Sequence, residues 1–170
     1  AGHCYTDVKM VFIYREENPE QMDNWECMKW FPHVWSEDKS TRYMASDELE
    51  TSDIFFELSN IIRERSQDDK KNFVKPHYVI FISDPSILEG EILAKYIYEA
   101  KPEYGITTFL MAEVLEQLPN ECEEIIENDT YFRGYYNLLD TGDKKQAFVP
   151  DHISAAQLSI FGQTLANIRV

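Results

Sequence analysis

The sequence has 170 residues, of which 44% are apolar and 14% aromatic, and its formal net charge is −15 at pH 7. This length and composition favour one folded domain, because single cores usually serve chains of roughly 100–200 residues and disordered chains are poor in aromatic residues. The negative charge repels nucleic-acid phosphates and anionic lipids, so we expect no nucleic acid partner; it serves either solubility alone or a basic protein partner.

The chain carries no signal for membrane insertion or for disulfide bonding. No apolar run approaches the roughly 20 residues that cross a bilayer, so we expect no direct insertion into a membrane. Cys4, Cys27 and Cys122 are odd in number and widely spaced, which indicates a reducing, cytosolic setting. A strand pattern begins close to Ala1 and a helical pattern runs to Val170, so we expect both ends to lie within a longer polypeptide.

The first half of the chain predicts a buried strand and two helices. Residues Asp7–Tyr14 form an almost continuous apolar run, as in a strand covered on both faces. Asn18-Pro19 reads as a helix start, followed by Met22, Trp25 and Met28 at helical spacing, and Trp30–His33 ends that helix. Ser46–Glu48 starts a longer helix, whose predicted apolar face comprises Leu49, Ile54, Phe55, Leu58, Ile61 and Ile62. The polar run Arg63–Lys75 is predicted to be a solvated helix end and loop.

The second half continues the alternation of strands and helices. His77–Ser83 and Gly105–Ala112 are apolar runs of the buried-strand type. The intervening residues, Pro85 to about Ala100, are predicted to be helical, with an inward face of Ile87, Leu88, Ile92, Leu93, Tyr96 and Ile97. Glu124–Ile126 and Thr130–Leu139 predict short strands or a hairpin, and Thr141-Gly142-Asp143 a turn. Ser154 and Gln157 form a capping-box pair before a final helix with Leu158, Phe161, Leu165 and Ile168 on one face.

This order predicts the fold class. Strands that are apolar throughout and alternate with helices form a mainly parallel sheet with helices on both faces, a three-layer α/β architecture. We expect residues 1–170 to form one such domain, since no interior linker or repeat interrupts them.

No intact phosphate-binding loop is present in the sequence. None of the six glycines begins a GxxxxGK[ST] motif, and no two are spaced as in GxGxxG. Tyr78–Asp84 nevertheless resembles the strand that holds magnesium in phosphate-loop ATPases, with Ser83 and Asp84 at its end. Pro85 stands where a catalytic carboxylate commonly follows, so we expect no catalytic residue; alternatively, Asp84 simply caps the next helix.

Other candidate chemistry is weakly supported. Cys27 and His33 could form a nucleophile and base, but a single pair on one short stretch is not specific. No His or Cys residues are spaced as metal ligands, apart from the adjacent His3 and Cys4, so no metal site is predicted. An independent small-molecule enzyme would need convergent polar groups at the strand ends, where only Ser83-Asp84 and Glu113 are available.

Aromatic residues gather between Trp25 and Trp35. Trp25, Trp30, Phe31 and Trp35 either belong to the core or form a docking surface for a neighbouring domain, since aromatic side chains anchor interfaces. The sequence leaves both possibilities open.

Several segments together resemble one family. The runs are DVKMVFIYREEN, WECMKWFPHVWSEDKSTRYMAS, KPHYVIFISDPSILEG, GITTFLMAEVLEQLPNECEEIIE and the tail PDHISAAQLSIFGQTLANIRV. In this order they are similar to the membrane-anchored ATPases of type VII (ESX-like) secretion systems of Gram-positive bacteria, the EssC/YukB family of the FtsK/SpoIIIE group. The match covers nearly the whole chain and falls on the first, degenerate ATPase-like domain after the transmembrane segments.

The resemblance implies a RecA-like sheet and a non-catalytic role. By analogy, Asp7–Tyr14 follows the phosphate-loop helix, Tyr78–Asp84 is the vestige of a nucleotide and magnesium site, and Gly105–Ala112 is the next strand. It implies a scaffold or regulator on the cytoplasmic side of the membrane, coupling the membrane part to later motor domains. Its partners would be neighbouring domains, sister subunits in a hexamer and other membrane components of the machine. ATP and magnesium would belong to the later domains, with no cofactor in this segment. The alternative is a slow, nucleotide-binding ATPase domain whose phosphate loop lies upstream of residue 1.

Overall fold

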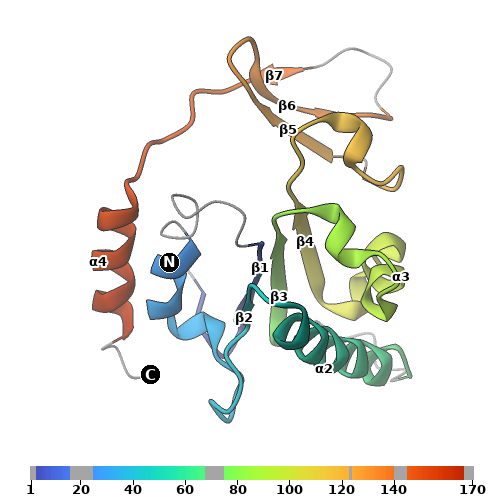
Figure 1. Cartoon of the computed structure of the whole chain (residues 1–170), viewed down its shortest axis with the longest axis vertical. Helices are drawn as coiled ribbons and strands as arrows, with labels where there is room; N and C mark the ends of the chain where they lie inside the picture. The colour runs from blue at the N-terminus through green and yellow to red at the C-terminus, as the bar shows by residue number, and fades with distance from the viewer. Residues whose placement is uncertain (1–2, 16–24, 68–74, 123, 140–144, 167–170) are drawn as a thin grey trace.

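A four-stranded parallel sheet forms the centre of the molecule in the computed structural model, which describes residues 3–15, 25–67, 75–122, 124–139 and 145–166 (Figure 1). Its strands are β1 (Val8–Ile13), β2 (Met44–Ala45), β3 (His77–Ile82) and β4 (Ile106–Leu110), in the order β2-β1-β3-β4. The three longer strands are the three apolar runs of the sequence, as predicted.

One face of the sheet, here called the helical face, is covered by two α-helices. The helices are α2 (Glu48–Gln67) and α3 (Ile92–Glu99), the latter preceded by the 3₁₀ helix η3 (Pro85–Leu88). Their apolar side chains pack on alternate residues of β1 and β3, which are almost completely buried: Val11, Ile13, Tyr78, Ile80 and Ile82. This cluster is the larger of the two cores.

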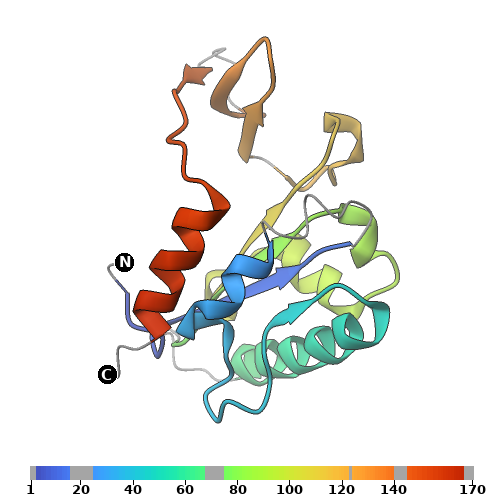
Figure 2. The same cartoon turned by 60° about the vertical axis from the view of Figure 1, so that its left-hand side comes forward.

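The opposite face, here called the phenylalanine face, carries Phe12 and Tyr14. Two 3₁₀ helices, η1 (Cys27–Trp30) and η2 (Pro32–Val34), and the C-terminal helix α4 (Ala155–Ala166) pack over it around Phe31 and Val34. Figures 1 and 2 show α4 and η1 side by side, on the side of the sheet away from α2 and α3. Helices on both faces of a parallel sheet confirm the predicted three-layer α/β fold.

A second, antiparallel sheet follows the 3₁₀ helices η4 (Pro102–Tyr104) and η5 (Leu115–Gln117). It comprises β5 (Glu124–Asn128), β6 (Arg133–Asn137) and β7 (Gln146–Ala147). The short strands predicted near the edge of the main sheet therefore form a separate hairpin with one added strand. No helix within the described residues is long and apolar enough to span a membrane.

Helix starts follow the sequence signals. The Asp47 carboxylate accepts a hydrogen bond from the Glu50 amide at 2.9 Å at the start of α2. At α4, the Gln157 amide donates to Ser154 Oγ at 3.2 Å, and the Ser154 amide donates to Gln157 Oε1 at 3.0 Å. The predicted capping box is confirmed.

The predictions of one helix over Pro85–Ala100 and of inward-facing Ile92 and Leu49 are wrong. Pro85–Ala100 is not one helix, because Gly90, at φ +80°, separates η3 from α3. Ile92, the first residue of α3, and Leu49, in the first turn of α2, are both exposed, although both were predicted to face inward. The solvated helix end predicted within Arg63–Lys75 is confirmed in part: α2 ends at Gln67 and most of its last residues are exposed, but Arg65 is part-buried and bonded to backbone carbonyls, and residues 68–74 fall outside the described residues. The predictions at Asn18-Pro19, Met22, Thr141–Asp143 and Ile168 fall outside the described residues.

Gly162 sets how closely α4 approaches η1. A Cβ at this position would lie 3.0 Å from Trp30 Cβ and 3.1 Å from Phe31 Cε2. Gly162→Val is therefore expected to push α4 outward and lower the free energy of unfolding by about 1–3 kcal/mol, the usual cost of overpacking. Urea unfolding followed by tryptophan fluorescence measures this effect. The matched variant Ile160→Val, on the exposed side of α4, is expected to unfold as the parent does; equal destabilisation by both variants would refute the close contact.

Candidate functional site

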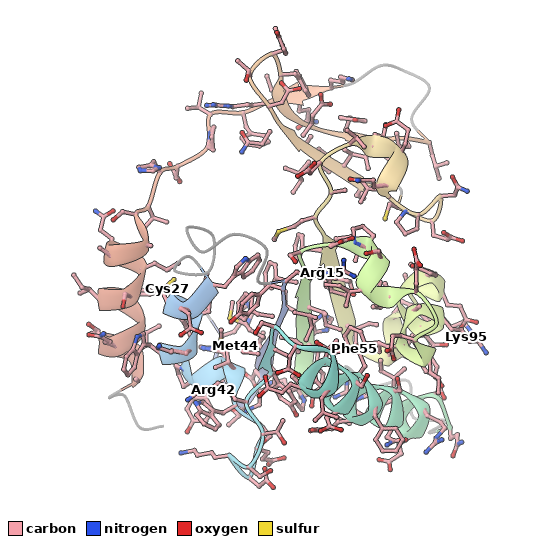
Figure 3. The ribbon with its side chains drawn as sticks, viewed as in Figure 1. Arg15, Cys27, Arg42, Met44, Phe55 and Lys95 are labelled. Atoms are coloured by element: carbon pink, nitrogen blue, oxygen red, sulfur yellow. The ribbon has the colours of Figure 1, made fainter. Side chains whose placement is uncertain are left out.

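Polar side chains meet where β1 and β3 end. The two strands are parallel neighbours with Ile13 opposite Ile82, so the residues after them lie side by side. The Ser83 amide donates to the Ile13 carbonyl at 3.0 Å, and the Arg15 amide donates to Ser83 Oγ at 3.2 Å. Figure 3 labels Arg15 at this end of the sheet. The carboxyl ends of parallel strands are where α/β proteins usually bind ligands.

Both carboxylate oxygens of Asp84 have partners in this arrangement. Oδ1 accepts the Ser86 amide at 2.8 Å, and Oδ2 lies 3.2 Å from Arg15 Nη1. Asp84 is thus the N-cap of η3, with Pro85 in the first turn. Partial desolvation raises the pKa of Asp84, but hydrogen bonds from Ser86 and the Arg15 charge outweigh it, so the net pKa is lowered and the carboxylate is ionised at neutral pH.

The chemistry available at these strand ends is limited. A magnesium ion held through water would need an outward-facing carboxylate, and here that carboxylate already has a guanidinium beside it. Pro85 supplies no group that could orient an attacking water molecule. Glu113, beyond β4, is exposed, and its amide donates to Gln117 Oε1 at 3.0 Å. Within the described ranges no group of three His, Cys, Asp or Glu side chains could hold a metal ion.

The four aromatic residues singled out in the sequence have different surroundings. Trp25, Phe31 and Trp35 pack in the core cluster on the phenylalanine face, where Trp25 stacks on Tyr14 with ring centroids 5.6 Å apart. Phe31 also contacts Phe161 of α4 edge-on at 5.9 Å. Trp30 is more exposed than the other three. Most of the cluster thus contributes to packing, and the docking surface stays a prediction that concerns Trp30 most.

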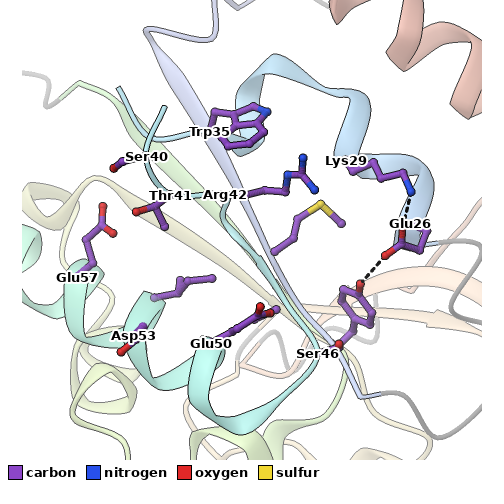
Figure 4. A pocket seen from close by; sticks show the side chains of 14 residues that line it. Glu26, Lys29, Trp35, Ser40, Thr41, Arg42, Ser46, Glu50, Asp53 and Glu57 are labelled. Carbon is purple, nitrogen blue, oxygen red and sulfur yellow. Dashed lines mark hydrogen bonds and ion pairs between the residues drawn. The ribbon is translucent and has the colours of Figure 1, made fainter. Parts of the chain in front are cut away.

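A polar cavity of about 580 Å³ lies between η1, β2 and α2, and Asp84 is not among the residues that line it (Figure 4). Its walls carry four carboxylates, Glu26, Glu50, Asp53 and Glu57, against the cations Lys29 and Arg42. Lys29 Nζ bonds Glu26 at 2.6 Å, which lowers the pKa of that glutamate, and the Arg42 guanidinium stacks 4.5 Å from the Trp35 ring centroid. The excess of negative charge disfavours a phosphate ligand here.

Sequence inspection missed Arg15 as a partner of Asp84. Both residues directly follow predicted apolar strands, but only the pairing of β1 with β3 in the structure brings them together. The cavity beside Arg42 had no comparable signal, since its walls come from segments far apart in the sequence.

The chain has recognisable relatives, although no family model matches it. It is 25% identical over 173 aligned positions to the type VII secretion system protein EssC of Staphylococcus aureus (strain NCTC 8325 / PS 47), with 98% of the chain covered. It is 27% identical over 128 positions to the ESX secretion system protein EccC of Geobacillus thermodenitrificans (strain NG80-2), with 74% covered. The chain spans only 12% and 8% of the lengths of these two relatives. The resemblance seen in the sequence is confirmed.

Proposed function

We propose that this chain, a homologue of a segment of the type VII secretion proteins EssC and EccC, is a non-catalytic, ATPase-like scaffold or regulatory domain of a protein-secretion translocase. In this role residues 1–170 form one degenerate domain that couples the membrane part of a longer protein to downstream ATPase domains. The names of the relatives support a role in secretion, and the small share of their length that the chain spans supports its being part of a larger protein.

The observation that carries the proposal is the pair Asp84-Pro85 where β3 ends. Asp84 is the one acidic side chain at the end of β3, yet one of its oxygens caps η3 and the other pairs with Arg15. The ion pair is solvent-exposed and is worth no more than about 1 kcal/mol, so Arg15 alone would not exclude magnesium. The stronger argument is Pro85, because without a carboxylate after Asp84 the attacking water has no base. Ser83 and Asp84 are proposed to be the vestige of a nucleotide and magnesium site.

The remaining expectations follow from this role. The proposed partners are neighbouring domains of the same polypeptide, sister subunits and other membrane components of the secretion machine. By analogy with the family, the sister subunits would form a hexamer. The domain is proposed to lie on the cytoplasmic side of the membrane, with ATP and magnesium bound by later domains of the longer protein. Trp30 is the proposed centre of a contact with a neighbouring domain, because it combines exposure with an aromatic ring.

Nucleotide titration tests the proposal. The chain is expected to bind Mg–ATP no more tightly than about 1 mM, or roughly −4 kcal/mol, and to release no phosphate above background. Isothermal titration and a phosphate-release assay measure the two quantities. Asp84→Asn is the matched control, because asparagine still caps a helix while lacking the charge. In the longer protein, Asp84→Asn is expected to leave export of substrate proteins unchanged.

Two outcomes would contradict the proposal in different ways. Micromolar ATP binding with turnover by this chain, lost in Asp84→Asn, would show an active site in it. The same result only for a chain that starts upstream of residue 1 would favour the alternative, a slow ATPase domain whose phosphate loop precedes Ala1.

A further inference from the structure

Two large apolar side chains are exposed on the solvent side of α2. Leu49 is 74% exposed and Phe56 is 68% exposed, although the opposite side of this helix forms part of the larger core. The two residues are seven positions apart, or two helical turns, so they lie on one side of the helix about 10 Å apart along its axis. Exposed apolar residues that are scattered singly are common, whereas an aligned pair gives a helix side on which a partner can pack.

The acidic wall of the polar cavity runs beside this pair. Glu50, Asp53 and Glu57 line the cavity and recur on α2 at intervals of three and four residues, so they form one row (Figure 4). Asp53 is four residues after Leu49 and three before Phe56, and its side chain is therefore next to both. The row of carboxylates and the apolar pair form one continuous surface, here called the α2 surface.

The cations that line the cavity already have partners within the chain. Lys29 Nζ bonds Glu26 at 2.6 Å, beside η1. The Arg42 guanidinium lies 4.5 Å from the ring centroid of Trp35. With four carboxylates against two cations, the cavity keeps an excess of negative charge.

Two carboxylates of the α2 surface stand out as available for a ligand. Glu57 accepts a hydrogen bond from the hydroxyl of the buried Tyr43 at 2.6 Å, and this neutral donor positions the carboxylate without removing its charge. The Asp53 carboxylate has no hydrogen-bond or ion-pair partner within the described part of the chain. Like charges four residues apart on a helix repel each other, so a cation placed between Asp53 and Glu57 would be stabilising.

These features define the class of ligand. An anion is repelled, and no group of three side chains that could hold a metal ion occurs within the described residues. An arginine side chain fits the arrangement, because its planar guanidinium can donate to two carboxylates at once and its aliphatic stem packs on apolar surface. The cavity volume of about 580 Å³ is ample for one such side chain.

We propose that the α2 surface binds a segment of a partner protein in which an arginine lies beside apolar side chains. The arginine enters the cavity between Asp53 and Glu57, and its apolar neighbours pack on Leu49 and Phe56. The net charge of −15 favours association with a basic partner. Trp30 is not among the residues that line this cavity, and the proposal holds whether or not the domain binds a nucleotide.

A second copy of the chain fits the α2 surface less well. Contact across a two-fold axis at α2 would bring the same carboxylates of the two copies face to face, and each copy carries a net charge of −15. Such a dimer would cover the apolar pair only at the cost of repulsion between the acidic rows. A basic segment covers the apolar pair and neutralises the row together.

Titration with designed peptides, followed by the amide NMR signals of the chain, tests the proposal. The probe is a 15-residue helical peptide with two leucines seven residues apart and three arginines beside them. It is expected to bind with a Kd below about 1 mM and to shift the signals of residues 49–57. Binding is expected to weaken as the salt concentration rises, because the contact is partly electrostatic. The same peptide with glutamate in place of arginine is expected not to bind, and a lysine version to bind at least about threefold more weakly.

Two double variants separate the site from the general charge of the chain. Asp53→Asn with Glu57→Gln is expected to weaken binding of the arginine peptide at least about tenfold, because both charged acceptors are lost while Tyr43 keeps a partner. Glu116→Gln with Glu121→Gln removes the same charge from exposed positions outside the cavity, and it is expected to leave the Kd within about twofold of the parent value.

Two apolar variants test the other half of the α2 surface. Phe56→Ala is expected to weaken binding at least about fivefold, since the ring is a large part of the contact. Ile160→Ala, at a similarly exposed position on α4, is expected to leave binding unchanged. Unchanged amide signals outside α2 show that each variant is folded.

Three results would overturn the proposal. The first is a Kd for the arginine peptide above about 1 mM, or equal binding of the arginine, lysine and glutamate peptides. The second is equal weakening by the two double variants, which would reduce the effect to general charge. The third is a shift of the α2 signals with the concentration of the chain alone, which would identify a second copy as the occupant. None of these measurements involves a nucleotide, so failure here is separable from failure of the non-catalytic assignment.

Discussion

Phe55→Ala is expected to lower the free energy of unfolding by about 3–5 kcal/mol, the largest effect of any single substitution considered. Phe55 is 1% exposed and lies in the core cluster between α2 and the sheet, as its label in Figure 3 shows on the ribbon of α2. Removing the ring loses the stabilisation from its buried apolar surface and leaves a cavity that the surrounding side chains cannot fill. Because the whole free energy of unfolding of a domain is typically about 5–15 kcal/mol, the variant would be marginally stable.

The adjacent Phe56 provides a matched control. It has the same side chain on the same helix but is 68% exposed. Phe56→Ala is expected to change the free energy of unfolding by less than about 0.5 kcal/mol, as surface substitutions usually do. Urea unfolding followed by circular dichroism compares the two variants. A Phe56 effect as large as that of Phe55 would mean that the exposed face of α2 is buried against something in solution.

Arg65→Met is expected to cost about 2–4 kcal/mol, because it removes the hydrogen bonds by which one side chain joins three segments. The guanidinium donates to the Tyr104 and Pro76 carbonyls, each at 2.8 Å. It also lies 5.2 Å from the Tyr78 ring centroid. Burial lowers the pKa of Arg65, yet an arginine remains charged at any ordinary pH. Methionine preserves the stem but leaves both carbonyls without their donor, at roughly 1–3 kcal/mol for each buried group.

Arg63 is the control for Arg65 within the same helix turn. Its guanidinium bonds the Asn60 side chain at 2.8 Å in an exposed setting. Arg63→Met is expected to be within about 0.5 kcal/mol of the parent. Arg65→Lys, which keeps the charge but not the forked geometry, is expected to fall between Arg65→Met and the parent. Thermal unfolding compares the stabilities of Arg65→Met, Arg65→Lys and Arg63→Met. Identical unfolding midpoints for Arg63→Met and Arg65→Met would contradict the bridging role of Arg65.

The strands of the main sheet could be predicted because their apolar runs are continuous. β1 and β3 are buried on the helical face and partly or fully covered on the other, so their polar residues are few: Lys9 within β1 and His77 at the start of β3. Lys9 is itself buried, and its ammonium donates to the Trp35 carbonyl at 2.6 Å. Because its long side chain carries the charge to a carbonyl outside the strand, Lys9 is compatible with a buried position in β1.

The helices were predicted less well because helical spacing tolerates errors of one position. Leu49 fits the spacing of the apolar face of α2, but it lies in the first turn of the helix and is exposed. Gly90 looked compatible with a continuous helix, yet its positive φ divides the segment in two. Arg65 sits in a run of polar residues, and only the fold shows that carbonyls lie within its reach.

Only part of the candidate site could be predicted from the sequence. Asp84 and Pro85 could be identified from the strand before them and the turn after them, and the structure places both where β3 ends. Arg15 could not be assigned to Asp84 until β1 and β3 were known to be neighbours, since 68 residues separate Arg15 from Ser83. Pairing between distant strands is the information that local patterns lack.

The attachment of α4 has a mechanical consequence. This helix follows an extended stretch after β7 and contacts the body through Leu158, Phe161 and Leu165, with Gly162 against η1. A pull on α4 would be transmitted to the cluster around Phe31, which contains Phe12 on β1. Because β1 is hydrogen-bonded on both sides, to β2 and to β3, the load would be shared along two rows of backbone bonds instead of peeling one strand from an edge.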